Sequence, residues 1–190
     1  MEAAAAALSL MAAVSAATAV AAAAAPLPPF TIAPGVEMPA VNLGHPDDSG
    51  GKRTNEAAST ELWLSLGGSG IDTAADYSNQ DQVAIGIETA VAKGLNHTSV
   101  FVTTKISPSD CSQASAVAAV QADLKQLKRS TVDLVLHHFP CRNAAGNAAI
   151  WAGLLEAQRM GLARAVGVSN YKASDLEKLL EDGAPAPAVN

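Results

Sequence analysis

The chain has 190 residues, enough for one domain with a buried core, since domains of about 100 to 200 residues are usual. Its formal net charge at pH 7 is −6, only 16% of its residues are charged and no basic cluster occurs, which argues against a nucleic-acid partner. Cys111 and Cys141 have neither metal-type spacing nor the density of a disulfide scaffold, so the sequence predicts two ordinary thiols.

Residues 1–29 form an alanine-rich segment in which Glu2 is the only charge. The length of the segment and the small residues near its end are typical of a secretory signal, whereas the positive region that normally opens such a signal is missing. A disordered or helical tail is a second interpretation, and a retained membrane span is a third. The sequence leaves all three open, so we divide the chain into this segment and a body at 30–190.

The body opens with a predicted β-hairpin and continues with alternating helices and strands. Two short apolar stretches flank the turn Ala33-Pro34-Gly35, and the second leads into a strand at 40–43. Hydrophobic spacing and glycine stop signals predict the elements that follow. The helices are expected at 56–66, 81–93, 112–128, 148–160 and 174–181, and the strands at 71–73, 100–103, 132–136 and 165–168.

The C-terminal part adds two further signals. Ser174 and Glu177 have the spacing of a capping box, which predicts that the last helix begins there. Residues 186–190 are typical of the start of one more strand. About five strand and helix units are therefore expected, followed by the stub of a sixth strand.

The alternation of apolar strands with helices predicts a parallel sheet with right-handed crossovers, either an open doubly wound sheet or a barrel. An open sheet that binds a dinucleotide would carry a Gly-x-Gly-x-x-Gly turn after its first strand. Gly67-Gly68-Ser69-Gly70 precedes a strand and is better interpreted as a helix stop. The fold class that we predict is α/β of the (β/α)8 TIM-barrel type, incomplete because a full barrel needs about 250 residues, with the hairpin as a cap.

Four polar side chains stand at or just beyond the ends of the predicted strands: Asp72, Tyr77, Lys105 and His138. In a parallel barrel the carboxyl ends of the strands meet on one face, where catalytic side chains gather from separate loops. Asp72 would keep Lys105 charged, and a charged lysine beside Tyr77 favours the phenolate, which makes the tyrosine a usable proton donor or acceptor. His138 could donate a hydrogen bond to a carbonyl oxygen and polarise it.

Each of these residues also has an ordinary structural interpretation. A single Asp or Lys at a strand end is more often a turn former or a solvated charge, and a single Tyr is more often half-buried packing. His137 and His138 are adjacent, so on a strand they face opposite sides, and one of them is expected to be a packed, hydrogen-bonded histidine. His45 and His97 fall in predicted loops, and no pair of residues has ligand spacing, so we predict no metal site.

Five ordered motifs resemble the signatures of the aldo-keto reductase family. They are Ile-Asp-Thr-Ala-Ala-Asp-Tyr at 71–77, Thr-Lys-Ile at 104–106, Asp-Leu-Val-Leu-His-His-Phe-Pro at 133–140, Ala-Val-Gly-Val-Ser-Asn-Tyr at 165–171 and Pro-Ala-Val-Asn at 187–190. The resemblance covers the body at 30–190. It implies a (β/α)8 barrel that binds NADPH and reduces aldehydes or ketones to alcohols by hydride transfer.

The resemblance also implies roles for individual residues. The catalytic residues that it implies are Asp72, Tyr77, Lys105 and His138. The cofactor-binding residues that it implies are Gly44, Asp72, Ser169 and Asn170. Tyr77 would be the general acid, and Ser169 and Asn170 match the pair that holds the nicotinamide carboxamide.

Some positions depart from the family pattern. His137 stands where an aliphatic residue is usual, and Phe139 stands where Trp is common. Gly44 is followed by His45-Pro46 in place of the usual hydroxyl and aromatic residues. The wall of the substrate pocket and one contact on the nicotinamide side are therefore expected to differ from those of the family.

The chain ends at Asn190, where the sixth strand begins. In the family, a Gln near the nicotinamide and a basic loop that binds the adenosine 2′-phosphate would follow. We therefore expect a C-terminally truncated reductase with weak or absent turnover on its own. The open edges of a five-stranded sheet would favour self-association.

Three functional hypotheses remain. The first is a reductase by descent that acts on a small carbonyl substrate, with a cytoplasmic location by family. The second is a catalytically inactive chain that serves as an interaction or regulatory partner. The third is a secreted or membrane-associated binding module, in which residues 1–29 are the targeting sequence. Its location would then be secretory or organellar. A membrane role is expected only if residues 1–29 are retained as a membrane span.

Overall fold

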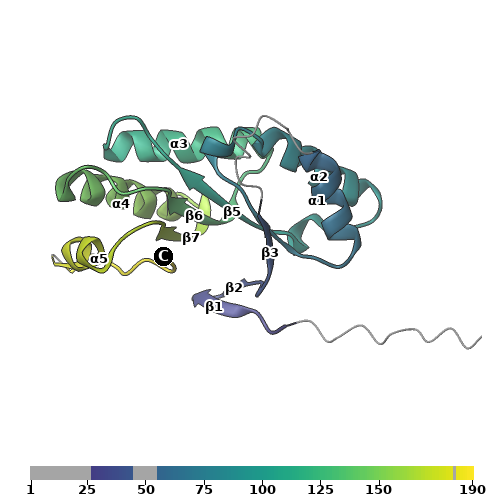
Figure 1. Ribbon diagram of the computed structural model, residues 1–190, viewed down its shortest axis with the longest axis horizontal. Coiled ribbons are helices and arrows are strands. Elements are labelled where there is room, and N and C mark those ends of the chain that lie inside the picture. Colours follow the sequence, from purple (N-terminus) through teal and green to yellow (C-terminus); the bar gives the residue numbers. More distant parts are fainter. Residues whose placement is uncertain (1–26, 45–54, 182) are drawn as a thin grey trace, which may run out of the picture.

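Strands and helices alternate along the chain, as the hydrophobic pattern predicts (Figure 1). The computed structural model describes residues 27–44, 55–181 and 183–190. The interpretations of residues 1–26 of the N-terminal alanine-rich segment and of His45-Pro46 fall on residues outside these ranges. Within these ranges, no helix combines the length and the apolarity that crossing a membrane requires.

Five parallel strands form the main sheet, in the order in which they occur in the sequence. They are β3 (Asn42–Gly44), β4 (Gly70–Asp72), β5 (Phe101–Ile106), β6 (Val132–His137) and β7 (Ala163–Val168). Each strand begins or ends within a few residues of its predicted position. Sequential order in an all-parallel sheet is the arrangement of a barrel wall, so the barrel-type prediction is confirmed for these units.

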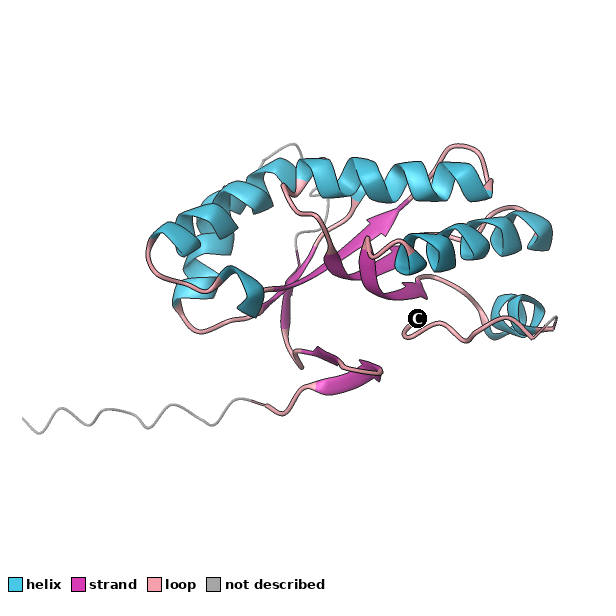
Figure 2. Ribbon diagram, turned by 180° about the vertical axis from the view of Figure 1, so that it is seen from behind, coloured by secondary structure: helices cyan, strands magenta, loops and turns pink. Residues whose placement is uncertain are grey.

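The helices lie on one side of the sheet (Figures 1 and 2). They are α1 (Glu56–Ser65), α2 (Gln80–Ala92), α3 (Gln113–Gln126), α4 (Ala144–Arg159) and α5 (Ala173–Leu180). Two short 3-10 turns that the sequence pattern does not predict are η1 (Ala75–Tyr77) and η2 (His97–Ser99). Gly153 lets α4 approach α3 closely, because a Cβ at this position would lie 2.5 Å from the carbonyl oxygen of Gln113.

The predicted hairpin consists of β1 (Phe30–Ala33) and β2 (Val36–Met38), which pair antiparallel on the side of the sheet opposite the helices (Figure 2). Gly35 in its turn has a φ of +73°, a conformation that favours glycine. The carbonyl of Gly35 accepts a hydrogen bond of 2.7 Å from Arg164 Nη2 on β7. The hairpin is thus tied to the last strand of the main sheet.

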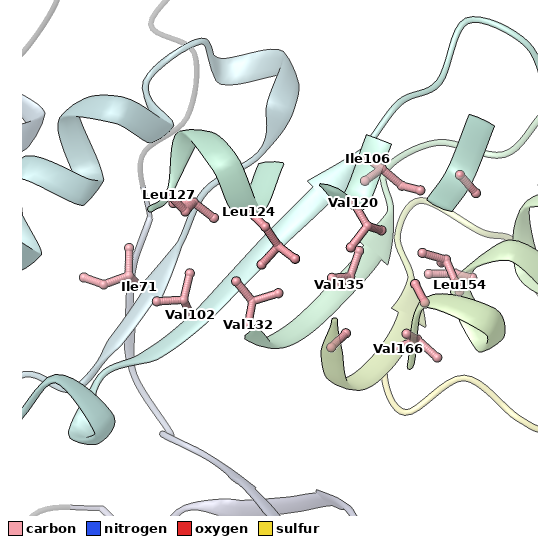
Figure 3. Packing of buried hydrophobic residues seen from close by; sticks show 14 of the residues in the cluster. Ile71, Val102, Ile106, Val120, Leu124, Leu127, Val132, Val135, Leu154 and Val166 are labelled. Atoms are coloured by element: carbon pink, nitrogen blue, oxygen red, sulfur yellow. The ribbon is translucent and has the colours of Figure 1, made fainter. Parts of the chain in front are cut away.

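The central strands β5 and β6 are buried on both faces, whereas β3 is only partly buried. The larger apolar cluster fills the space between the sheet and the helices and includes Ile71, Val102, Val135 and Leu154 (Figure 3). A smaller cluster lies on the hairpin side and consists of Val36, Phe101, Leu134, Leu136 and Ala165. Burying each Val, Leu, Ile or Phe side chain of these clusters contributes about 1.5 to 3 kcal/mol. This two-sided burial explains why the strands read as almost continuous apolar runs.

Two predicted helix starts need correction. Helix α4 begins four residues earlier than expected, because the side chain of Asn143 accepts a hydrogen bond of 2.8 Å from Gly146 N and caps the helix there. The predicted capping box of Ser174 and Glu177 is wrong. Helix α5 begins one residue earlier, and Asp175 Oδ2 accepts a bond of 3.0 Å from Lys172 N.

The two cysteines form a disulfide, so the prediction of ordinary thiols is wrong. Cys111 lies in the loop after β5 and Cys141 in the loop after β6, with their Cα atoms 6.3 Å apart. Parallel strand order places these loops side by side, although 30 residues separate the cysteines in sequence. Spacing in the sequence alone does not predict this pairing.

The last residues of the chain run beside β7 without forming a full strand. Val168 N donates to Val189 O and Ala188 N donates to Val166 O, both at 3.0 Å. The side chain of Asn190 exchanges two hydrogen bonds with the backbone of Tyr171, at 3.0 and 3.3 Å. The predicted strand stub is therefore present as a short extended segment that follows the edge of β7.

Candidate active site

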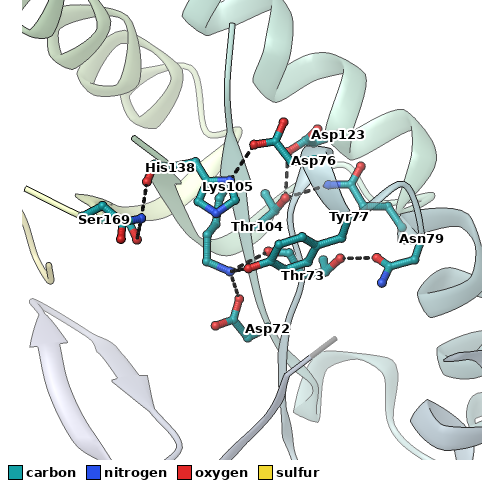
Figure 4. A network of polar contacts seen from close by, with 12 residues as sticks. Asp72, Thr73, Asp76, Tyr77, Asn79, Thr104, Lys105, Asp123, His138 and Ser169 are labelled. Carbon is teal, nitrogen blue, oxygen red and sulfur yellow. Dashed lines mark hydrogen bonds and ion pairs between the residues drawn. The ribbon is translucent and has the colours of Figure 1, made fainter. Parts of the chain in front are cut away.

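The polar residues predicted from the strand ends come together at the carboxyl edge of the sheet (Figure 4). Asp72 is the last residue of β4, Lys105 lies near the end of β5, and His138 directly follows β6. Tyr77 ends η1, the turn that follows β4. The sequence folds this way because parallel strands deliver the residues after them to the same edge.

Lys105 is at the centre of the site and is 7% exposed. Its Nζ forms an ion pair with the carboxylate of Asp72 and donates hydrogen bonds of 3.2 Å to Thr73 O and of 3.2 Å to Tyr77 Oη. An ammonium group has three N–H donors, and these three acceptors match them. A buried charge is costly unless it is paired and hydrogen-bonded, so the site is built to keep Lys105 charged.

The loop between β4 and α2 fixes the position of Tyr77. Its backbone N–H donates to Ala74 O at 3.1 Å, and Ser78 then reverses the chain with a φ of 52°. Behind this turn, Thr73 Oγ1 donates to Asn79 Oδ1 at 2.8 Å. The phenol ring is partly exposed, and the Lys105 ammonium lies 4.8 Å from its centroid. The hydroxyl therefore contacts the buried lysine while its ring stays within reach of solvent.

His138 is buried and contacts aromatic rings on two sides. Its ring meets that of Tyr77 edge-on at 5.6 Å between centroids and stacks on that of Phe139 at 4.3 Å. Its Nδ1 lies 2.8 Å from Asp76 Oδ2. Burial lowers the pKa of His138 below its usual value, and the charge of Lys105 lowers it further, whereas Asp76 and Asp72 oppose these effects.

Asp76 is a site residue that the sequence interpretation missed. Its Oδ2 also accepts a hydrogen bond of 2.6 Å from Ser107 Oγ, in the loop after β5. Asp76 thus connects η1 to the loops after β5 and β6. Its partner His138 is 62 residues away in sequence, and the only local signal is its position next to Tyr77.

The two adjacent histidines face opposite sides of β6, as the alternation of strand side chains requires. His137 points toward the helices and its Nδ1 lies 2.7 Å from Tyr171 Oη. Burial and the neighbouring His138 lower the pKa of His137 to about 4. Burial also raises the pKa of Tyr171, and the charge of Asp175 adds to this. His137 is therefore a packed, hydrogen-bonded histidine that anchors the loop after β7.

That loop carries Ser169 and Asn170. Ser169 N donates to His137 O at 2.9 Å, and Asn170 has a φ of 60°. The side-chain nitrogen of Asn170 donates to His138 O at 2.8 Å and to Ser169 Oγ at 3.2 Å. The two polar side chains are therefore held at the edge where Tyr77 and Lys105 meet.

Gly44, the remaining predicted cofactor residue, ends β3 and pairs in register with Asp72. It is exposed, and nothing among the described residues lies within 4 Å of where its Cβ would be. The residues at this edge thus include an open backbone position, a hydroxyl and a carboxamide. This donor and acceptor set fits the nicotinamide end of a dinucleotide, because a carboxamide needs both a donor and an acceptor.

A buried polar network lies behind the site, on the helix side of β5. Thr104 Oγ1 donates to Asp123 Oδ2 on α3 at 2.7 Å and accepts from Gln80 Nε2 at 2.7 Å (Figure 4). Burial raises the pKa of Asp123 to about 6, against the effect of the hydrogen bonds from Thr104 and Gln80, and the charge of Asp76 adds to the rise. The network fixes the strand segment that carries Lys105.

A cavity of about 790 Å³ lies at the opposite edge of the sheet. Its lining includes Pro39, Ser69, Ser99 and Arg164, which lie at or before the amino ends of their strands, and it contains none of the predicted site residues. Function in barrels of this type is located at the carboxyl edge, and the amino edge serves stability. We therefore place the site at the carboxyl edge. Among the described residues, no cluster of side chains suits a metal ion.

The chain is similar to known proteins of one family. The profile of the Aldo/keto reductase family matches residues 47–190. Aldo-keto reductase AKR2E4 of Bombyx mori is 36% identical over 63% of this chain and 42% of its own length. Glyoxal reductase of Bacillus subtilis is 34% identical over 82% of this chain and 54% of its own length.

A solved structure extends the comparison to the fold. The crystal structure of Bombyx mori AKR2E4 in complex with NADP is similar with a TM-score of 0.77 and 31% identity, covering 86% of this chain and 57% of that protein. The chain spans about half the length of the curated relatives that it matches. Motifs, strand order and these comparisons together lead to one conclusion: the chain belongs to the aldo/keto reductase family.

Proposed function

We propose that this chain carries the proton-transfer site of an NADPH-dependent reductase of aldehydes or ketones. The observation that carries the proposal is the contact of Lys105 Nζ with both Asp72 and Tyr77 Oη. Similarity to a structure solved with NADP and to a glyoxal reductase supports the cofactor and the substrate class.

The residues would act as follows on a carbonyl substrate. NADPH, when bound, would supply the hydride that the carbonyl carbon receives. Tyr77 gives its hydroxyl proton to the carbonyl oxygen, which completes the alcohol and leaves a phenolate. The ammonium of Lys105 stabilises that phenolate, because an opposite charge at hydrogen-bond distance favours the charged form. Asp72 keeps Lys105 charged and in place.

Three residues would position the cofactor. The oxygen of the Asn170 carboxamide and the hydroxyl of Ser169 would meet the carboxamide of the nicotinamide. Gly44 would allow the close approach of the ring, since a side chain at this exposed position would occupy that space. All three residues lie at the same edge of the sheet as Tyr77.

The test uses the full 190-residue chain. Calorimetric titration measures NADPH binding, and the loss of NADPH absorbance with glyoxal or an aromatic aldehyde measures turnover. Tyr77→Phe should retain any cofactor binding and lower the rate at least 100-fold, since general acid catalysis contributes about 10² to 10⁴. Tyr171→Phe is the matched control, because it removes the other tyrosine hydroxyl without touching Lys105.

Two results would count against the proposal. If Tyr77→Phe reacts as fast as the unchanged chain, Tyr77 is not the general acid. If the chain neither binds nor oxidises NADPH, catalysis by residues 1–190 is wrong, and the alternative of an inactive chain with an interaction or regulatory role becomes the better interpretation. Family membership stands in either case.

A further inference from the structure

The contact between the carboxylate of Asp76 and the ring of His138 indicates which ring nitrogen of the histidine carries the proton. Asp76 Oδ2 lies 2.8 Å from His138 Nδ1, and Ser107 Oγ donates to the same oxygen at 2.6 Å. An ionised carboxylate has only acceptor atoms, so the ring nitrogen that contacts it must carry the hydrogen. The hydrogen bond made by one nitrogen of a neutral histidine decides the state of the other.

We infer that Asp76 is a positioning residue that holds the proton of neutral His138 on Nδ1 and leaves Nε2 without a proton. This inference deepens the proposed function and rests on it for its catalytic meaning. Nε2 can then donate to a carbonyl oxygen only when the imidazole is protonated. When His138 is neutral, Tyr77 donates a hydrogen bond to the substrate oxygen and His138 does not.

The surroundings of His138 determine when it gains the second proton. Burial and the charge of Lys105 disfavour the imidazolium, whereas the carboxylates of Asp76 and Asp72 favour it. His137 and Tyr77 are the other titratable side chains next to the ring. Since the net effect lowers the pKa of His138, polarisation of the carbonyl by this residue should appear as the pH falls below the usual histidine range.

Nitrogen NMR of the full chain labelled with ¹⁵N-histidine tests the tautomer directly. Pyrrole-like and pyridine-like resonances distinguish the two ring nitrogens, and the His138→Gln variant identifies the signals of His138. At neutral pH the unchanged chain should have the proton on Nδ1. Asp76→Ala should shift His138 toward the Nε2–H tautomer and lower its pKa, because the acceptor and its negative charge are both removed.

Two further variants control the experiment. Asp81→Ala removes an exposed carboxylate at the start of α2 that is not among the groups acting on His138, and it should change neither the tautomer nor the pKa. Ser107→Ala removes the second donor to Asp76 and should leave the proton on Nδ1. A proton on Nε2 in the unchanged chain, or no change in Asp76→Ala, overturns the inference.

This experiment needs neither cofactor nor substrate. A chain that fails to reduce aldehydes would refute the proposed function and leave the tautomer measurement intact. An active chain with the proton on Nε2 would refute the inference and leave the proposed function standing. The two failures are therefore distinguishable.

Discussion

Lys105 is almost removed from water, yet its Nζ has three hydrogen-bond acceptors, one of them the carboxylate of Asp72. Its three acceptors lie at the end of β4, just after it and in η1. Residues 28 to 33 positions away in sequence therefore compensate for the loss of hydration of the buried ammonium. Breaking such a pair by removing one partner costs more than replacing both, since the remaining charge has lost its counter-ion. The ion pair between Lys105 and Asp72 should therefore affect both the stability of the fold and the geometry of the site.

A double-mutant cycle measures this balance. Asp72→Asn should lower the free energy of unfolding by about 1 to 2 kcal/mol, a value reduced because Asp72 is 39% exposed. In a Lys105→Met background the same change should cost almost nothing. Urea denaturation of the four proteins provides the comparison. Equal losses in both backgrounds would mean that the ion pair does not stabilise the fold.

Asp123 gives a second prediction, on pH. Its pKa is raised from 3.8 to about 6 in the folded chain, so the folded state binds this proton more tightly than the unfolded state does. The stability contribution of this group is therefore fully present below about pH 4 and is lost as the pH rises to about 6, by about 3 kcal/mol in total. The free energy of unfolding of Asp123→Asn minus that of the unchanged chain should therefore increase by about 3 kcal/mol between pH 4 and 7.

Denaturation curves at several pH values test this prediction. His137 has the opposite sign, because its pKa is lowered to about 4 and its contribution is lost as the pH falls from about 6.5. On acidification from pH 6 to 4, Asp123→Asn should therefore lose more stability than the unchanged chain, because it lacks the protonation of Asp123 that offsets the loss from the histidines with a lowered pKa, which are His97, His137 and His138. Parallel curves for the two proteins would contradict the assignment of a raised pKa to Asp123.

At the scale of elements, the disulfide joins the loops that follow β5 and β6. Lys105 and His138 are carried by the strand ends from which these loops start. Gly146 at the start of α4 packs against both cysteines, since a Cβ on this residue would lie 2.8 Å from Cys111 Cβ and 2.9 Å from Cys141 Cβ. The bridge thus connects the loops after the two strands that carry Lys105 and His138 to the beginning of a helix.

Reduction of the bridge should lower the free energy of unfolding by about 3 to 4 kcal/mol. The estimate follows from the loop-closure entropy of the 30-residue separation between the two cysteines. Denaturation with and without a reductant measures the effect, and a Cys111→Ser, Cys141→Ser double variant should be insensitive to the reductant. A chain whose stability is the same in both conditions would show that the bridge does not constrain the unfolded state.

The order and type of the helices and strands could be predicted from the sequence, because each has its own hydrophobic pattern and four of the five helices are followed by a glycine: α1 by Gly67, α2 by Gly94, α4 by Gly161 and α5 by Gly183. The start of α4 and the cap of α5 could not, since both depend on which nearby polar side chain reaches a free backbone N–H. Near α5, Ser174 has a capping propensity similar to that of Asp175, so the residue type alone does not decide which side chain reaches the free N–H. Local capping signals therefore place helix ends only to within a few residues.

In the folded chain, strands that follow one another in the sequence lie next to one another in the main sheet. Strand ends and their polar residues could be predicted, and the resemblance to a known family supplied their expected roles. The contacts of Asp76 with His138 and of Cys111 with Cys141 could not be predicted, because each joins residues on loops that only the folded sheet brings together. The hydrophobic pattern of the sequence predicts strands and helices, but it does not predict contacts between loops that follow different strands.

The two tryptophans occupy different ends of this architecture. Trp63 on α1 is partly exposed, and its Nε1 donates to Gly70 O at the start of β4 at 2.9 Å. Trp151 on α4 is 3% exposed, and its Nε1 donates to Pro185 O in the C-terminal segment at 3.1 Å. Because Trp63 is already partly exposed, a Trp63→Phe variant leaves Trp151 as the one indole, and red-shifted, acrylamide-quenchable emission in that variant marks release of the C-terminal segment from α4.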